Sequence, residues 1–103
     1  MIGKKYEIFI GLKDKDTYEE IFDVNIFAQV LSHKCANKRI GFSLCTQLGG
    51  YTHNKGYVTE TSLRITLIGI NEEEVYSLGE YLKELINTDT ILITNEDCEY
   101  IFA

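Results

Sequence analysis

Seven side chains suited to binding gather in one stretch of the sequence, between residues 47 and 64. They are Gln47, Tyr51, His53, Lys55, Tyr57, Glu60 and Arg64. His53 and Lys55 are candidates for contact with an anion, and Arg64 can bind a phosphate or a carboxylate through its planar guanidinium group. Tyr51 and Tyr57 can stack on a base or on an aromatic partner. This stretch is therefore our candidate ligand or partner site.

Each of these side chains also has a structural explanation. Glu60 and Arg64 lie four residues apart and can pair with neighbouring strands, while the two tyrosines can pack around a turn. The sequence contains no nucleophile elbow, phosphate loop or histidine–metal motif, and its three cysteines are too far apart for a zinc site or a disulfide framework. We therefore predict no catalytic residue, no metal and no cofactor.

The elements that must position these residues follow from the hydrophobic pattern. They are a strand over 5–13, a helix over 24–36 behind an Asp23 N-cap and ending at Asn37, two strands over 40–51 and 57–68 that form a hairpin, a helix from Asn71 to Asn87, a strand over 90–94, a turn over 95–97 and a short edge strand over 98–102. This order predicts a single α+β domain over residues 1–103. The fold is a ferredoxin-like βαββαβ plait, with two helices on one face of a four-stranded antiparallel sheet.

Alternation along the hairpin assigns its side chains to two faces. The apolar set predicted to lie under the helices is Ile40, Phe42, Leu44, Leu48, Leu63, Ile65 and Leu67. The opposite face, here called the open face, carries Gln47, Glu60 and Arg64 beside apolar Phe9 and Ile68. An uncovered face with that much apolar area is unfavourable for a monomer, so we expect a second copy, a partner or a ligand to cover it.

Composition limits the classes of partner. The chain is 45% hydrophobic and 25% charged, with a formal net charge of −6. This acidity argues against a general nucleic-acid binder, because such a protein needs a basic surface to neutralise phosphates. The apolar runs are too short for a membrane span, and the first residues lead directly into a strand pattern without a signal peptide. We expect a cytoplasmic protein, in the host cytoplasm if a phage encodes it.

The hairpin pattern resembles that of a small ferredoxin-like family of unknown function found in bacteria and phages. The resemblance rests on Gly50-Tyr51 followed by Gly56, Val58, Glu60 and Ser62, with Ile10-Gly11-Leu12 and Gly41-Phe42-Ser43 earlier in the chain. It implies the same fold and transfers no reaction. Short, acidic, proline-free domains are also similar in style to phage proteins that block host defences.

These observations favour a non-enzymatic binding or inhibitor protein, a homodimer or other homo-oligomer through its open face. It would mask a surface of a host protein or sequester a small anionic, nucleotide-like signal. The alternatives are an enzyme built as a dimeric α+β barrel that acts on a small organic substrate, and a structural assembly module.

Overall fold

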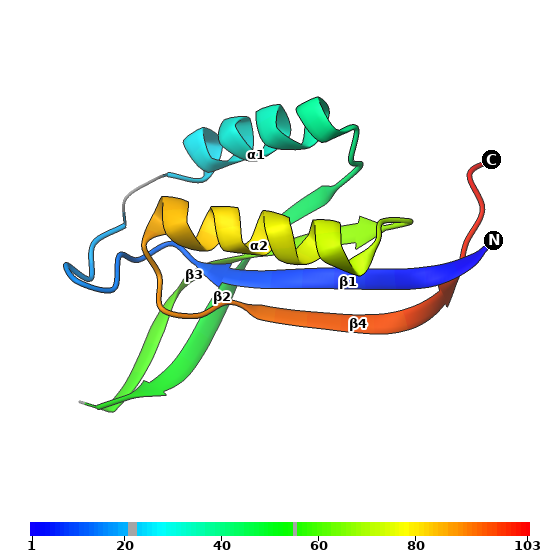
Figure 1. Ribbon diagram of the computed structural model, residues 1–103. Coiled ribbons are helices and arrows are strands. Elements are labelled where there is room, and N and C mark those ends of the chain that lie inside the picture. Colours follow the sequence, from blue (N-terminus) through cyan, green and yellow to red (C-terminus); the bar gives the residue numbers. More distant parts are fainter. Residues whose placement is uncertain (21–22, 55) are drawn as a thin grey trace.

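Four strands and two helices make up the described chain (Figure 1). The structure is a computed structural model that describes residues 1–20, 23–54 and 56–103, without the side chains of Tyr51 and His53. The elements are β1 (Ile2–Gly11), α1 (Val24–Lys38), β2 (Ser43–His53), β3 (Gly56–Ile68), α2 (Glu72–Ile86) and β4 (Leu92–Glu99). The strands pair antiparallel in the order β2-β3-β1-β4, and both helices cover one face of the sheet. This arrangement confirms the predicted ferredoxin-like plait.

The core lies between the helices and one face of the sheet. The strands contribute Tyr6, Ile8, Ile10, Leu63, Ile65 and Leu67, and the helices contribute Phe27, Leu31, Cys35, Val75, Leu78, Leu82 and Ile86; all are buried. Within residues 6–10 of β1 and 63–67 of β3, every second residue belongs to this set, as period-two alternation requires. The alternate positions, including Glu60 and Arg64, lie on the open face.

Polar caps fix the helix ends. The Asp23 carboxylate accepts a hydrogen bond from the Ile26 amide at 2.8 Å, and the Asn71 side chain accepts one from the Glu74 amide at 2.8 Å. Asn87 ends α2 in the left-handed conformation with φ 60°. These three caps agree with the prediction, but α1 runs past Asn37 to Lys38, and Arg39 caps it in the left-handed conformation instead. Neither helix of the described chain has the length and apolarity that crossing a membrane requires.

Two predicted features of the strands are wrong. Leu48 is 78% exposed, because the free end of the β2–β3 hairpin extends beyond the helix layer (lower left in Figure 1). Residues 95–97 are not a turn, because their backbones pair with β1. The side chains of the paired residues Lys5 and Glu96 also form an ion pair, with 2.7 Å between Nζ and Oε1. β4 therefore continues to Glu99, and no separate edge strand follows it among the described residues.

Candidate functional site

A cleft of about 410 Å³ opens where the β2–β3 hairpin diverges from the end of β1. Its floor belongs to the open face, and its wall is formed by the loops that follow β1 and α2. The lining includes Phe9, Gly11, Lys13, Asp14, Lys15, Tyr18, Gly49, Gly50, Glu60, Ser62, Thr88, Asp89, Thr90 and Leu92. This size is within the range of small-molecule sites, which hold a few well-placed polar groups among apolar ones.

Glu60 is an acidic residue that lines the floor of the cleft. Its Oε2 is buried and accepts no hydrogen bond within the described chain. The neighbouring hydroxyl of Ser62, a residue only 9% exposed, is likewise buried without a partner. Two adjacent buried polar groups without hydrogen-bond partners are costly, and at a cleft they indicate that a ligand or water supplies the missing hydrogen bonds.

Gly11 makes room for the Glu60 carboxylate. A Cβ added at position 11 would overlap Oε1 of Glu60, because the carboxylate lies directly over the glycine backbone. Gly11 is the last residue of β1 that pairs with β3, where it lies opposite Ser62. Lys13 follows two residues later, in the loop after β1, and its side chain lines the same cleft as Glu60. The end of the β1–β3 ladder therefore brings one acidic and one basic side chain to the same cleft.

Burial raises the pKa of Glu60 above its ordinary value of 4.5. The positive charge of Lys13 lowers the pKa and partly offsets this effect, while the negative charge of Glu20 adds to it. The ammonium group of Lys13 makes no ion pair with any side chain that the structure describes. The cleft therefore holds an unpaired carboxyl and an unpaired ammonium group.

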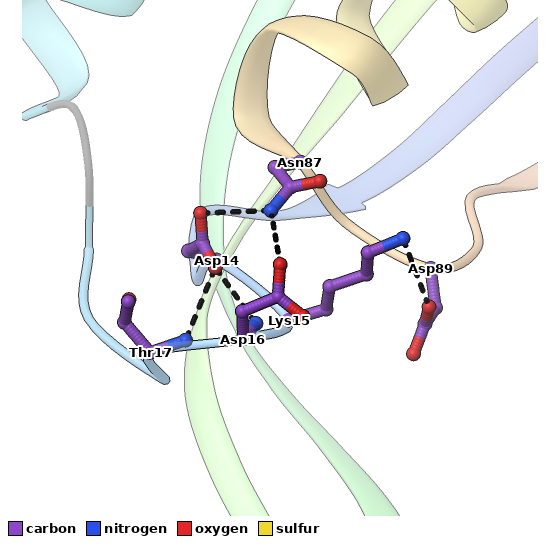
Figure 2. A network of polar contacts seen from close by, with 6 residues as sticks. All are labelled: Asp14, Lys15, Asp16, Thr17, Asn87 and Asp89. Carbon is purple, nitrogen blue, oxygen red and sulfur yellow. Dashed lines mark hydrogen bonds and ion pairs between the residues drawn. The ribbon is translucent and has the colours of Figure 1, made fainter.

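A polar network joins the two loops of the cleft wall (Figure 2). The side-chain amide of Asn87 donates to the carboxylates of Asp14 and Asp16, each at 3.0 Å. The backbone carbonyl of Asn87 accepts from the backbone N–H of Lys15 at 2.9 Å. Lys15 faces Asp89 at 3.7 Å. The hydrogen bond from Asn87 is also the main reason that the pKa of Asp14 is lowered. These contacts hold the loop after β1, and thus Lys13, against the end of α2.

Arg64 lies outside the cleft lining and already has partners. Its guanidinium pairs with Glu7 at 3.3 Å and donates to the Cys45 thiol at 3.7 Å. Lys5 continues this charged row across the open face to Glu96. Structural pairing, one of the two explanations considered for Arg64, is what the structure contains.

The other predicted site residues are not gathered into one site. Gln47 pairs with Ser62 on the open face, whereas Tyr57 is 72% exposed and pairs with Thr52 near the hairpin tip. Tyr51 and His53 belong to β2 by their backbones. Lys55 is outside the described residues. Of the predicted set, Glu60 alone contributes to the cleft lining in the described chain.

Sequence reasoning missed Gly11, Lys13 and Ser62 as members of the site. Gly11 and Lys13 belong to β1 and the loop behind it, far from the hairpin in the chain, and the pairing of β1 with β3 brings the end of β1 close to Glu60. The sequence offers one clue, which is that Gly11 shares the parity of Phe9, a residue that the alternation assigns to the open face. Within the described chain, no group of three or more potential metal ligands gathers at the cleft or elsewhere.

The sequence matches no protein-family model and no curated protein. Solved structures do share the fold. A phage SAM (S-adenosylmethionine) lyase in complex with S-methyl-5'-thioadenosine matches with a TM-score of 0.72 and 24% identity, over 91% of this chain and 80% of the lyase chain. A phage SAM lyase in the apo state matches with a TM-score of 0.73 and 23% identity, over 93% and 81% of the two chains.

A more distant match is CPII, a nitrogen regulatory PII-like protein from Thiomonas intermedia, bound to ADP, AMP and bicarbonate. Its TM-score is 0.50 at 12% identity, over 95% of this chain and 87% of that one. At these identities the matches establish the fold. They also correct the prediction of a non-enzymatic binding protein, because the structures that match at TM-scores above 0.7 are those of an enzyme with a small-molecule substrate. The enzyme alternative fits these matches better.

Proposed function

We propose that this protein is an enzyme that cleaves S-adenosylmethionine and releases S-methyl-5'-thioadenosine. The observation that carries the proposal is the Glu60 carboxyl, which lies in a cleft of ligand size without a hydrogen-bond partner for Oε2. The fold matches support the substrate class, since they include a SAM lyase bound to S-methyl-5'-thioadenosine and a protein bound to ADP and AMP. All these ligands contain an adenosine group.

The cleavage breaks the bond between the sulfonium sulfur and the γ-carbon of the amino-acid tail. Sulfur keeps the electron pair and becomes the neutral thioether of S-methyl-5'-thioadenosine. A lyase adds no water, so the γ-carbon must gain its new bond from within the substrate. We propose that the substrate's own carboxylate forms this bond and closes a lactone. The sulfonium and carboxylate charges disappear together, and no proton has to move.

Ring closure suits this cleft better than elimination. Elimination would require a base to remove an unactivated proton from the β-carbon, and a carboxylate such as Glu60 is too weak a base for that step. Intramolecular attack needs chiefly that the tail is held in the reactive geometry, which is what a binding cleft provides. Glu60 then acts through its negative charge, which attracts the sulfonium cation and loses that attraction once the sulfur becomes neutral.

The test is to incubate purified protein with S-adenosylmethionine and follow S-methyl-5'-thioadenosine by chromatography, with the second product identified by NMR. Glu60→Gln should lower the rate by roughly a hundredfold or more, because it removes the charge at nearly constant shape. Glu73→Gln, an exposed position in the first turn of α2, at the opposite end of this helix from the cleft wall, is the matched control and should keep full activity. Absence of S-methyl-5'-thioadenosine from the wild-type reaction would refute the proposal.

We also propose that the protein is phage-encoded and forms a homo-oligomer through its open face. Apolar Leu92 and Ile68 on that face are 58% and 38% exposed, and no described element covers them. The two edge strands, β2 and β4, each have one side that pairs with no strand of the described chain.

A further inference from the structure

The cleft contains two unpaired groups of opposite charge at one end of the sheet. Glu60 lies over Gly11 on the floor, and Lys13 follows Gly11 by two residues in the loop after β1. Both side chains line the cleft, and no ion pair joins them to each other or to a neighbour in the part of the chain described. Such a separated pair matches a ligand that carries both a cation and an anion.

The other charged groups of the wall are already engaged. Asp14 and Asp16 accept hydrogen bonds from Asn87, and Lys15 faces Asp89. The backbone of Lys13 is held in place by its bridge to Glu20. This bridge does not involve the side chain, so the ammonium group can contact a ligand. Among the described cleft residues, Lys13 is therefore the cation available to an anionic group of the substrate.

From this arrangement we infer that Lys13 binds the α-carboxylate of the substrate's amino-acid tail and so determines specificity for ligands that carry this tail. The inference rests on the proposed lyase function and extends it to a residue. Lys13 is a positioning residue for the reaction, because it orients the carboxylate that attacks the γ-carbon. Glu60 faces the sulfonium sulfur, to which the same tail is attached.

Two stable ligands isolate the contribution of the tail. S-adenosylhomocysteine has the amino-acid tail, and S-methyl-5'-thioadenosine lacks it; both have a neutral sulfur and neither is cleaved. Loss of a charge-assisted hydrogen bond in Lys13→Met should weaken S-adenosylhomocysteine binding by roughly tenfold to a hundredfold. Binding of S-methyl-5'-thioadenosine should change less than about twofold, measured for both ligands by isothermal titration calorimetry.

Two further variants complete the experiment. Lys13→Arg keeps the charge and should retain most of the affinity for S-adenosylhomocysteine. Lys38→Met removes a lysine from the last turn of α1, across the sheet from the cleft, and should bind both ligands like wild type. In kinetics with S-adenosylmethionine, Lys13→Met should raise KM and lower kcat, since the tail is both bound and aligned through this residue.

The outcomes separate the two proposals. Equal weakening of both ligands by Lys13→Met, or no weakening of either, would overturn the role of Lys13 while the lyase function stands. If wild-type protein binds neither ligand and produces no S-methyl-5'-thioadenosine, the proposed function fails and this inference with it. Selective weakening of the tailed ligand supports Lys13 even before turnover is measured.

Discussion

Glu60 can keep its carboxyl group in the cleft because position 11 has no side chain. The added methyl of Gly11→Ala would occupy the space of Oε1, and the flexible Glu60 side chain would rotate away. We expect activity to fall by roughly tenfold or more, with a change in the free energy of unfolding within about 1 kcal/mol. Turnover and thermal melts measure the two effects.

Gly41→Ala is the matched control for this change. A Cβ at position 41 meets no atom of the described residues within 4 Å, so this variant should keep both activity and stability. Full activity in Gly11→Ala would mean that the carboxylate position above Gly11 is unimportant to the reaction.

The pKa of Glu60 makes a second prediction at this scale. Because burial raises this pKa, the folded state binds the proton more tightly than the unfolded state does. Below 4.5, the pKa in the unfolded state, Glu60 is protonated in both states and no charge is buried. As pH rises through the folded pKa, the buried carboxyl ionises and the free energy of unfolding falls. Lys13 opposes the shift and Glu20 adds to it.

Glu60→Gln should therefore be more stable than wild type at pH 7, by up to about 1 kcal/mol for this partly buried group, and equal to it near about pH 3.5. Urea unfolding at the two pH values measures the difference. A variant that is less stable at pH 7 would show that the Glu60 charge stabilises the fold.

At the scale of elements, the cap of α2 also serves the cleft. Asn87 takes the left-handed conformation, which glycine adopts at no cost, while its side chain holds Asp14 and Asp16. Asn87→Gly thus keeps the helix end and releases the loop that carries Lys13. We expect KM to rise by roughly threefold to tenfold and kcat to fall less than in Lys13→Met, measured by steady-state kinetics.

The opposite cap of α2 provides the comparison. Asn71→Gly costs only a few tenths of a kcal/mol at an N-cap, and the cleft lining does not include this residue. Its KM should equal that of wild type. Similar KM values for the two variants would show that the hydrogen-bond network of Asn87 does not contribute to substrate binding.

The elements also explain what the sequence could and could not predict. Alternation assigned Leu63, Ile65 and Arg64 to the correct faces, because parity along a strand is a local property. Parity does not tell where the helix layer ends, so Leu48 was placed under helices that do not reach it. Glu60 is a predicted site residue, but its cleft depends on the pairing of β1 with β3. That pairing joins segments far apart in the chain, and its register cannot be predicted from the sequence of either segment alone.

At the scale of the whole molecule, the described helices cover one sheet face and leave the other open. The charged row from Arg64 to Glu96 keeps part of the open face compatible with water, whereas Ile68 and Leu92 leave apolar area exposed at its two ends. We expect size-exclusion chromatography with light scattering to give a multiple of the 11.8 kDa chain mass. Burying these apolar side chains against a second copy is the physical reason.

Ile68→Asp tests this assembly without touching the cleft, whose lining does not include residue 68. A carboxylate buried at an interface is strongly unfavourable, so the variant should shift to the mass of one chain while its helices and strands, followed by circular dichroism, remain. The half-exposed position makes a loss of folding unexpected, since an aspartate there stays hydrated in the single chain. A wild-type protein that already has the mass of one chain at micromolar concentration would refute assembly through this face. Ile68 and Leu92 would then be exposed to solvent in the monomer.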